Sequence, residues 1–371
     1  MRTLKRSEDT KPLSARRGEQ AAGGLRRIAT DRADERQSNR TAALARGKKL
    51  AFVEPMKCQL RPNLPRDDGW VYEIKFDGIR VLAIKEGTDV KLFSRLGNDV
   101  TARFADIARD LLRLRAERAI IDGEVVALES SGKSSFQLLQ MSRLPGVKPP
   151  PICYYVFDAL RLDGVDLTGC PLHERKEKLA AALPEDGKLI RFSAGLKGDP
   201  QKLLEQIRAR GLEGLVGKKP DSHYEPGRRS GAWIKIKVIQ QQEFVIGGYT
   251  EPKGSREHFG ALLVGYYRSG KLMFASKVGT GFDRALLKSL QAQFRRLTAS
   301  DCPFANLPEP RAAGGGLTAS EMRRCTWLQP KLVCEVVFNE WTRDGHLRQP
   351  VYSGLREDKR PEEVVRETKP S

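Results

Sequence analysis

The chain has 371 residues, enough for two domains and a tail, and its 39% hydrophobic and 30% charged residues are typical of a globular protein. Its 66 Lys and Arg against 47 Asp and Glu give a net charge of +19. This excess favours a polyanionic partner, because neutralised phosphates release counterions. A membrane is the competing partner, but no apolar run approaches the roughly 18 residues that span a bilayer. Composition therefore predicts a nucleic-acid partner and no membrane.

The six cysteines form no CxxC pair and the four histidines are scattered, which argues against a zinc site. With no signal peptide in view, reduced thiols in the cytoplasm are the simplest expectation. Together with the positive charge, this predicts a cytoplasmic protein associated with the nucleoid.

Residues 1–50 carry 14 Lys and Arg against 6 Asp and Glu and have almost no large apolar side chains. Such a segment buries too little surface to offset the entropy of ordering, so we expect a disordered tail. A DNA-binding arm and a solubilising tail explain it equally well. A transit peptide is the third explanation, and the acidic residues argue against it.

Residues 51–238 alternate short apolar strands with amphipathic helices. The run 70–75 predicts a half-buried strand, which Asp77-Gly78 ends with a turn. Residues 233–237 alternate strictly, which places Lys235 and Lys237 on one strand face. The other expected elements are strands at 81–84, 90–93, 119–127 and 152–160, and helices at 104–114, 172–183 and 199–210.

Residues 239–365 differ in pattern, with strands expected at 244–248, 261–267, 272–276 and 332–341, one helix at 284–297 and a long loop at 303–316. Short strands with one helix predict a small closed barrel such as an OB-fold. We therefore expect an α+β protein with mixed or antiparallel sheets and flanking helices, then the barrel, and a short tail at 366–371.

Charged residues stand at the ends of several strands of the first domain: Lys75, Asp77, Arg80, Asp122, Glu124, Glu213, Lys218, Lys235 and Lys237. For any one of them a solvated strand face is the ordinary explanation. Glu124 and Glu213, however, lie in apolar runs, where an unpaired carboxylate is costly. Cations for phosphates and carboxylates for a divalent metal predict a cleft for a nucleoside triphosphate. Because no GxxxxGK[ST] occurs, a lysine is expected to perform covalent chemistry.

At this point the residues carry a resemblance. Lys75-Phe76-Asp77-Gly78-Ile79-Arg80 matches the KxDGxR signature of the covalent nucleotidyltransferases, which comprise DNA ligases, RNA ligases and mRNA capping enzymes. Alone, KxDG is a weak signal. It is followed in order by segments similar to the family's motifs Ia, III, IIIa, IV and V, namely Ser94–Gly97, Asp122–Glu124, Phe157-Asp158, Glu213–Lys218 and Trp233–Lys237.

The second domain resembles the OB domain of bacterial ATP-dependent DNA ligases in Glu243–Gly248, Lys277–Phe282 and the segment from Arg348 to Lys359. It is most similar to the ligase module of LigD-type end-joining ligases and their stand-alone relatives. The resemblance covers about residues 52–365 and leaves the N-terminal tail outside.

This resemblance implies three steps. The amine of Lys75 attacks the α-phosphate of ATP and expels pyrophosphate, leaving lysine-AMP. AMP then passes to the 5′-phosphate at a nick, and the 3′-hydroxyl finally attacks that phosphate and releases AMP. Lys75 must be unprotonated to attack, so Arg80, Lys235, Lys237 and Mg²⁺ or Mn²⁺ are expected to lower its pKa.

The resemblance also implies roles around the nucleotide. Arg80 and Arg95 hold ribose and phosphate, and Lys235 and Lys237 neutralise the α-phosphate. Lys218 also contacts the nucleotide. The remaining expectations are Phe157 stacking on adenine, Glu73 accepting from its amine, Glu124 binding the ribose or metal, and Glu213 binding metal.

The resemblance also implies residues that position the reacting groups. Asp77 belongs to the catalytic motif but is expected to fix the turn rather than to act as a base. Arg356, Asp358 and Lys359 are expected to orient pyrophosphate, which requires the barrel to swing over the cleft.

Three functions follow as alternatives: a nick-sealing DNA ligase, an RNA ligase or capping nucleotidyltransferase, and an inactive nucleic-acid-binding scaffold. The first is favoured by the LigD-like barrel and the intact motifs. The expected partners are duplex DNA with nicks or ends and a Ku-like end-binding protein, and the expected state is a monomer. Polymerase and nuclease activities would have to come from other chains.

Overall fold

The computed structural model describes residues 49–65, 67, 69–144, 146–252, 254–310 and 316–367. The expected tail at 1–50 lies outside the described residues except for its last two, and Leu50 is buried in a hydrophobic cluster with Met56 and Trp233. Residues from Leu50 onward form one compact unit. In the part of the chain described, no helix is long and apolar enough to cross a membrane.

The first sheet contains the strand that ends at Lys75. Its order is β1 (Gln59–Leu60), β10 (Trp233–Lys237), β9 (Gly214–Lys218) and β2 (Val71–Lys75). All neighbours are antiparallel except β1 and β10. Ile234 and Ile236 pack in one cluster with side chains of α5 (Pro200–Ala209). Trp233 faces the other way, and Lys235 and Lys237 share its face, as the alternation predicts.

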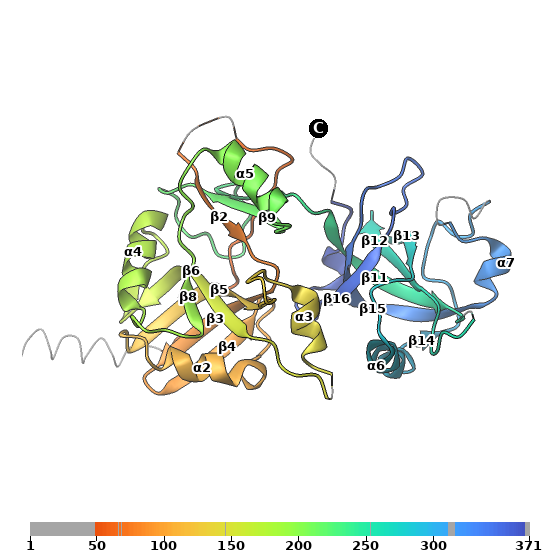
Figure 1. The fold of residues 1–371 in the computed structure, drawn as a ribbon, viewed down its shortest axis with the longest axis horizontal. Helices are drawn as coiled ribbons and strands as arrows, with labels where there is room; N and C mark the ends of the chain where they lie inside the picture. The colour runs from red at the N-terminus through yellow and green to blue at the C-terminus, as the bar shows by residue number, and fades with distance from the viewer. Residues whose placement is uncertain are drawn as a thin grey trace, which may run out of the picture. The chain divides into compact units, whose positions relative to one another are not determined.

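The second sheet packs against the first in Figure 1 and is apolar on both faces. Leu82 and Ile84 contact the cluster around Trp233, while Val81 and Ala83 contact the opposite cluster, which includes α2 (Ala105–Leu111). Its order is β4 (Asp89–Ser94), β3 (Ile79–Glu86), β5 (Arg118–Ala127), β6 (Ile152–Leu162) and β7 (Val165–Asp166), and β8 (Ile190–Phe192) pairs in parallel with β6. Helix α4 (Leu172–Ala182) also packs on β6.

Lys75 lies where the chain leaves the first sheet for the second. It is the last residue of β2, and β3 begins only four residues later. Gly78 turns between them so close to β5 that a Cβ there would lie 2.3 Å from the carbonyl oxygen of Val125. Only glycine permits this approach, which explains why the turn needs it.

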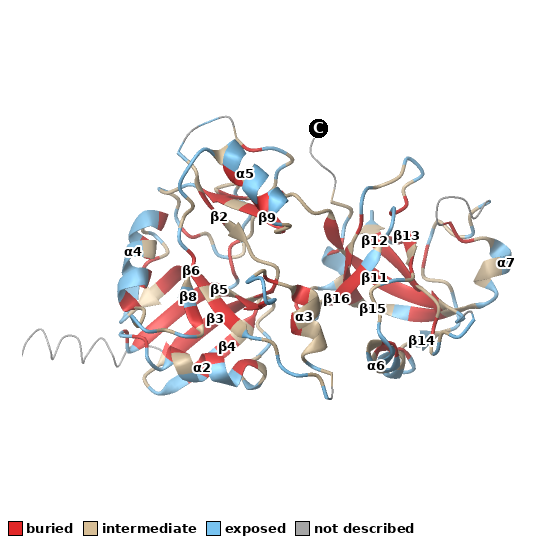
Figure 2. Cartoon of the chain, viewed as in Figure 1, coloured by how far each residue is buried: buried red, intermediate tan, exposed pale blue. Residues whose placement is uncertain are grey.

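The third sheet forms the barrel. Its order is β13 (Lys271–Val278), β12 (Leu262–Arg268), β11 (Gln241–Thr250), β15 (Cys325–Val337) and β14 (Thr298–Ala299), and β16 (Val351–Leu355) pairs with β15 on the same edge as β14. A bridge from Thr280 to Val351 joins the end of β13 to β16 and closes the ring. Figure 2 shows the buried residues along its strands. Helices α6 (Arg284–Phe294) and α7 (Ala319–Met322) flank it, as Figure 1 shows.

The structure corrects several predicted elements. β15 begins at Cys325 and ends at Val337, not at 332 and 341. Helix α3 (Phe136–Met141) and strand β16 were not predicted, because α3 spans fewer than two turns and the sequence of β16, VYSGL, does not alternate. Helix α3 is held by its cap, Ser135, and by the buried ring of Phe136. The one-turn 3-10 helices η1 (Ala102–Phe104) and η3 (Pro361–Glu363) were missed as well.

Asp158 forms a buried ion pair with Arg175, and its contribution to stability can be tested. Its carboxylate accepts two bonds from Arg175 on α4, at 2.8 and 2.7 Å, and both side chains are fully buried. Arg175→Met would leave the carboxylate buried without its partner. We expect a loss of about 3–5 kcal/mol in the free energy of unfolding, measured in urea. Arg284→Met, which breaks an exposed pair with Glu257, is the control and should have little effect. Equal losses in the two variants would show that the buried pair contributes no more to the free energy of unfolding than the exposed pair does.

Candidate functional site

One pocket of about 170 Å³ collects most of the predicted residues. Its wall comes from β2, β3, β5, β10 and the residue before β9 on one side and from β11, β15 and the segment after β16 on the other. The predicted residues that line it are Lys75, Asp77, Arg80, Arg95, Glu124, Glu213, Lys235, Lys237, Arg356, Asp358 and Lys359. Glu73, Phe157 and Lys218 are outside this lining, and Lys218 contacts both of the others.

Lys75 forms an ion pair with Glu213, the residue just before β9. The pairing of β2 with β9 sets this contact, because Lys75 lies opposite Gly214. Burial disfavours the charged amine, but the carboxylates of Glu213, Glu124 and Asp77 outweigh it and hold the pKa of Lys75 above its ordinary value. The prediction of a lowered pKa is therefore wrong for this state. Carboxylates, and not the expected cations, are the nearest charges to the amine.

Lys235 and Lys237 project from β10 toward one carboxylate. Glu367 accepts from both, at 2.8 Å from Lys235 and 2.7 Å from Lys237, and Lys237 also donates to the carbonyl of Gln241. Burial, together with the charge of Lys237, lowers the pKa of Lys235 to about 8. Both expected phosphate-binding groups are thus occupied by a residue that no sequence pattern singled out.

Arg80 lines the pocket, but its guanidinium is held by groups inside the protein. Its guanidinium makes a bidentate pair with Asp122, at 2.9 and 2.5 Å, and donates to the carbonyl of Met56 at 2.6 Å. Asp122 also accepts from the hydroxyl of Tyr224. The expected hold on ribose and phosphate would require donors beyond these three. Arg95, by contrast, has one weak partner, Glu363 at 3.4 Å.

Asp77 ties three segments together. Its carboxylate accepts from the backbone N–H of Phe136 at 2.9 Å and from the amide of Gln241 at 3.2 Å, and its own N–H donates to Ser134. These bonds join the turn after Lys75 to α3 and β11. The geometry is that of a positioning residue.

Glu73 lies under the first sheet with both oxygens occupied. It accepts from Lys176 at 2.6 Å, from Lys218 at 3.0 Å and from the hydroxyl of Ser193 at 3.0 Å. Burial would raise the pKa of Glu73, but the two lysines outweigh it and hold the pKa below its ordinary value. The expected bond to an adenine amine would require one of these partners to move.

Phe157 is half-buried beside the same lysine. The ammonium of Lys218 lies 4.3 Å from the centre of its ring and 4.3 Å from that of Trp233. Arg80 lies 5.4 Å from the Phe157 ring. The ring is therefore covered by cations in this state, and a stacked base would have to displace them.

Arg356, Asp358 and Lys359 follow β16 and line the same pocket as Lys75, so the barrel already stands over the cleft. Arg356 pairs with both oxygens of Asp358 at 2.9 Å and with Glu335 at 2.9 Å. Lys359 pairs with Glu243 at 2.7 Å. Each barrel cation thus has a carboxylate from its own domain.

Several residues in this pocket or in contact with the predicted residues were not predicted from the sequence. Glu335 lies in the apolar run of β15, just as Glu124 and Glu213 lie in theirs, so the same signal was available for it. Glu243 was quoted only as part of a barrel motif. Lys176 and Glu367 lie in charged segments that carry no distinguishing pattern.

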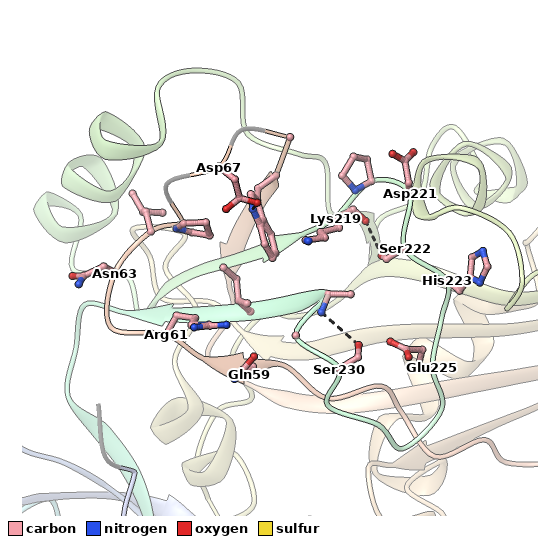
Figure 3. Close-up of a pocket in the computed structure, with 18 of the residues that line it drawn as sticks. Gln59, Arg61, Asn63, Asp67, Lys219, Asp221, Ser222, His223, Glu225 and Ser230 are labelled. Carbon is pink, nitrogen blue, oxygen red and sulfur yellow. Dashed lines mark hydrogen bonds between the residues drawn. The ribbon is translucent and has the colours of Figure 1, made fainter. Parts of the chain in front are cut away.

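A second pocket, of about 1120 Å³, lies elsewhere and is shown in Figure 3. Gln59 and Asp67 line it on one side, and Lys219, His223 and Glu225 from the loop after β9 line it on the other. Among the described residues it shares no lining residue with the smaller pocket and contains no predicted site residue. Its mixed charges indicate no particular ligand.

Comparisons with known proteins agree with the motifs and the fold. Residues 54–237 match the family model "ATP dependent DNA ligase domain", and residues 255–359 match "ATP dependent DNA ligase C terminal region". The chain is 40% identical over 320 residues to the multifunctional non-homologous end joining protein LigD of Pseudomonas aeruginosa and 38% identical over 298 residues to that of Mycolicibacterium smegmatis. It covers 37% of the length of each, and they cover 85% and 80% of this chain.

A solved structure agrees at the level of the fold. Mycobacterial DNA ligase D complexed with ATP and MES aligns with a TM-score of 0.63 at 34% identity, over 86% of this chain and 100% of that one. The fold is thus an adenylation domain followed by an OB-fold domain, as predicted. With both family models matched and this relative covered throughout, the chain belongs to the ATP-dependent DNA ligase family.

Proposed function

We propose that this chain seals nicks in duplex DNA through a lysine-AMP intermediate on Lys75. The observation that carries this proposal is the pocket in which the Lys75 amine stands with two carboxylates, Glu213 and Glu124, and two phosphate-binding cations, Lys235 and Lys237. These are the charges that phosphoryl transfer from a metal-bound triphosphate requires.

In the first step the neutral amine of Lys75 bonds to the α-phosphorus of ATP, and the bond to the β-phosphate oxygen breaks. The amine loses a proton and pyrophosphate leaves. Lys235 and Lys237 would neutralise the charge that grows on the α-phosphate. Arg356 and Lys359, which line the same pocket from the barrel side, would hold the departing pyrophosphate.

In the later steps Lys235 and Lys237 would neutralise phosphate charge while AMP passes to the DNA. The oxygen of a 5′-phosphate attacks the phosphorus of lysine-AMP, the P–N bond breaks, and Lys75 regains its proton. The 3′-hydroxyl then attacks the activated 5′-phosphate and AMP leaves. The net charge of +19 supports the binding of DNA backbone in these steps.

The pocket must open between these steps. Its volume of about 170 Å³ is below the roughly 300 Å³ at which ligand pockets begin. The barrel side, with Arg356 and Lys359, would therefore move away from Lys75 to admit ATP and later DNA. We infer that the two domains, residues 51–238 and 239–365, close over the pocket for adenylation and open for ligation.

Two residues fit a divalent cation, Mg²⁺ or Mn²⁺. One carboxylate oxygen of Glu213 is buried and has no hydrogen-bond partner among the described residues. Burial raises the pKa of Glu124 to about 8, although Lys75, Arg356 and Arg80 oppose it, so this carboxyl has an ionised form that a cation would favour. Such a cation would supply positive charge beside the α-phosphate and favour the neutral amine of Lys75.

The proposal extends to a role in DNA end joining. The LigD proteins of P. aeruginosa and M. smegmatis are named for non-homologous end joining. We propose that this chain acts as a monomer on broken or nicked DNA in the bacterial nucleoid, recruited by a Ku-like end-binding protein.

The nucleophile is tested by covalent labelling. Incubation with Mg²⁺ and α-labelled ATP should leave label on the denatured chain, and Lys75→Ala should abolish it because the attacking amine is gone. Lys91→Ala, on the exposed face of β4, is the matched control and should label normally. Persistent label on Lys75→Ala would show that another residue is the nucleophile.

The same assay separates the alternatives. Unlabelled wild-type protein would mean an inactive scaffold, and a preference for labelled GTP would favour a capping reaction. Sealing of nicked RNA in preference to nicked DNA would favour an RNA ligase.

The role of Asp77 is tested by a pair of variants. Asp77→Asn keeps an oxygen that can accept from the N–H of Phe136, so we expect it to keep most of the adenylation rate. Asp77→Ala removes the acceptor and should lower that rate at least about tenfold, because the turn that positions Lys75 loses its tie. Equal losses in both variants would instead identify Asp77 as a proton acceptor.

The metal assignment is tested by titration. Glu213→Gln keeps the size of the side chain but removes its charge, so the Mg²⁺ concentration for half-maximal labelling should rise about 10- to 100-fold. The matched control is Glu205→Gln on the exposed side of α5, which should leave the titration unchanged. An unchanged titration for Glu213→Gln would remove this residue from the metal site.

A further inference from the structure

The C-terminal segment after η3 runs along the barrel and ends beside Lys235 and Lys237 of β10, where Glu367 lines a hollow that shares Lys237 and Gln241 with the Lys75 pocket. The backbone N–H of Tyr267 donates to the carbonyl of Val364 at 2.7 Å, and Tyr267 forms a parallel bridge with Val365. Gln242 on β11 then binds the segment twice, donating to the carbonyl of Val365 at 3.1 Å and accepting from the N–H of Glu367 at 2.9 Å. These contacts attach the segment to the barrel and direct Glu367 toward the first sheet.

The carboxylate of Glu367 bridges the two lysines of β10. One oxygen accepts from Lys235 and the other from Lys237, so that each ammonium faces its own oxygen. Its side chain is 22% exposed, which makes this pair stronger than one on an open surface. Burial would raise the pKa of Glu367, but Lys235 and Lys237 outweigh it and hold the pKa below its ordinary value. The carboxylate is therefore ionised at neutral pH.

This arrangement has the form of a bound phosphate. Two oxygens that carry negative charge meet two ammonium groups on one strand face, as two non-bridging oxygens of an α-phosphate would. A phosphate that entered with Glu367 in place would meet a like charge within a few ångströms, which is unfavourable. The carboxylate and the phosphate therefore compete for the same two cations.

We propose that Glu367 is an internal competitor for the α-phosphate site, which holds the barrel closed over the nucleotide-free pocket and leaves Lys235 and Lys237 when ATP binds. The inference rests on the proposed function, since it requires that these two lysines receive the phosphate. It assigns to the C-terminal segment a restraint on nucleotide binding. The ion pairs join a segment fixed to the barrel with a strand of the first sheet, so releasing them also frees the two domains to separate.

Binding in a protein that cannot react provides the test. In the Lys75→Ala background, Glu367→Gln should bind ATP about fivefold more tightly by titration calorimetry, because the competing charge is absent. Glu362→Gln, an equal change of charge at an exposed position of η3, is the matched control and should not alter the dissociation constant. With Lys75 intact, Glu367→Gln should lower the KM for ATP in labelling and leave the maximal rate unchanged.

The outcomes separate the competitor from the function beneath it. An unchanged or weaker affinity in Glu367→Gln, in a protein whose wild type still takes up label, overturns the competitor and leaves the ligase proposal intact. An affinity raised equally by Glu362→Gln also overturns it, since net charge alone would then explain the effect. If the wild type takes up no label, the proposed function fails and the competitor fails with it.

Discussion

Charge neutralisation inside a closed pocket is the constraint on which this structure depends. Lys75 stands between two sheets at a place where water is largely excluded, and an unpaired ammonium there would be strongly unfavourable. Glu213, from the neighbouring strand, supplies the opposite charge. The strand pairing that brings these two residues together therefore also determines how charged the amine is before any substrate arrives.

Four other cations of the pocket, two from the barrel and two from the first sheet, are also paired with carboxylates. Arg356 is neutralised by Asp358 and Glu335, and Lys359 by Glu243, all from the barrel. Lys235 and Lys237, from the first sheet, have their counter-ion in Glu367. A triphosphate entering this pocket would exchange partners with carboxylates and would not simply add charge to an open cleft. The binding energy of the phosphates is thus partly used to displace internal ion pairs, which lets the protein close without a nucleotide.

The local patterns were sufficient for much of the fold because they rest on periodicity. Strict alternation in residues 233–237 placed Lys235 and Lys237 on one face, and helical spacing located α4 and α5 within a residue of their ends. The order and spacing of the motifs predicted the cluster of charged residues that meets in the pocket. Elements without a periodic pattern were missed, since the six residues of α3 span fewer than two turns and the five of β16 do not alternate.

By itself, the sequence determined the kind of protein and the kind of pocket: a basic α+β chain in which lysines, arginines and carboxylates at strand ends form a nucleotide site. Only the tertiary structure decided which charges pair. Glu367 reaches Lys235 across 132 residues, and Asp122 reaches Arg80 across 42, distances along the chain that no local pattern encodes. The direction of the pKa shift of Lys75 depends on which charges lie nearest in space. Since Coulomb energies fall with distance, the nearby carboxylates of Glu213, Glu124 and Asp77 outweigh burial and determine the direction of this shift.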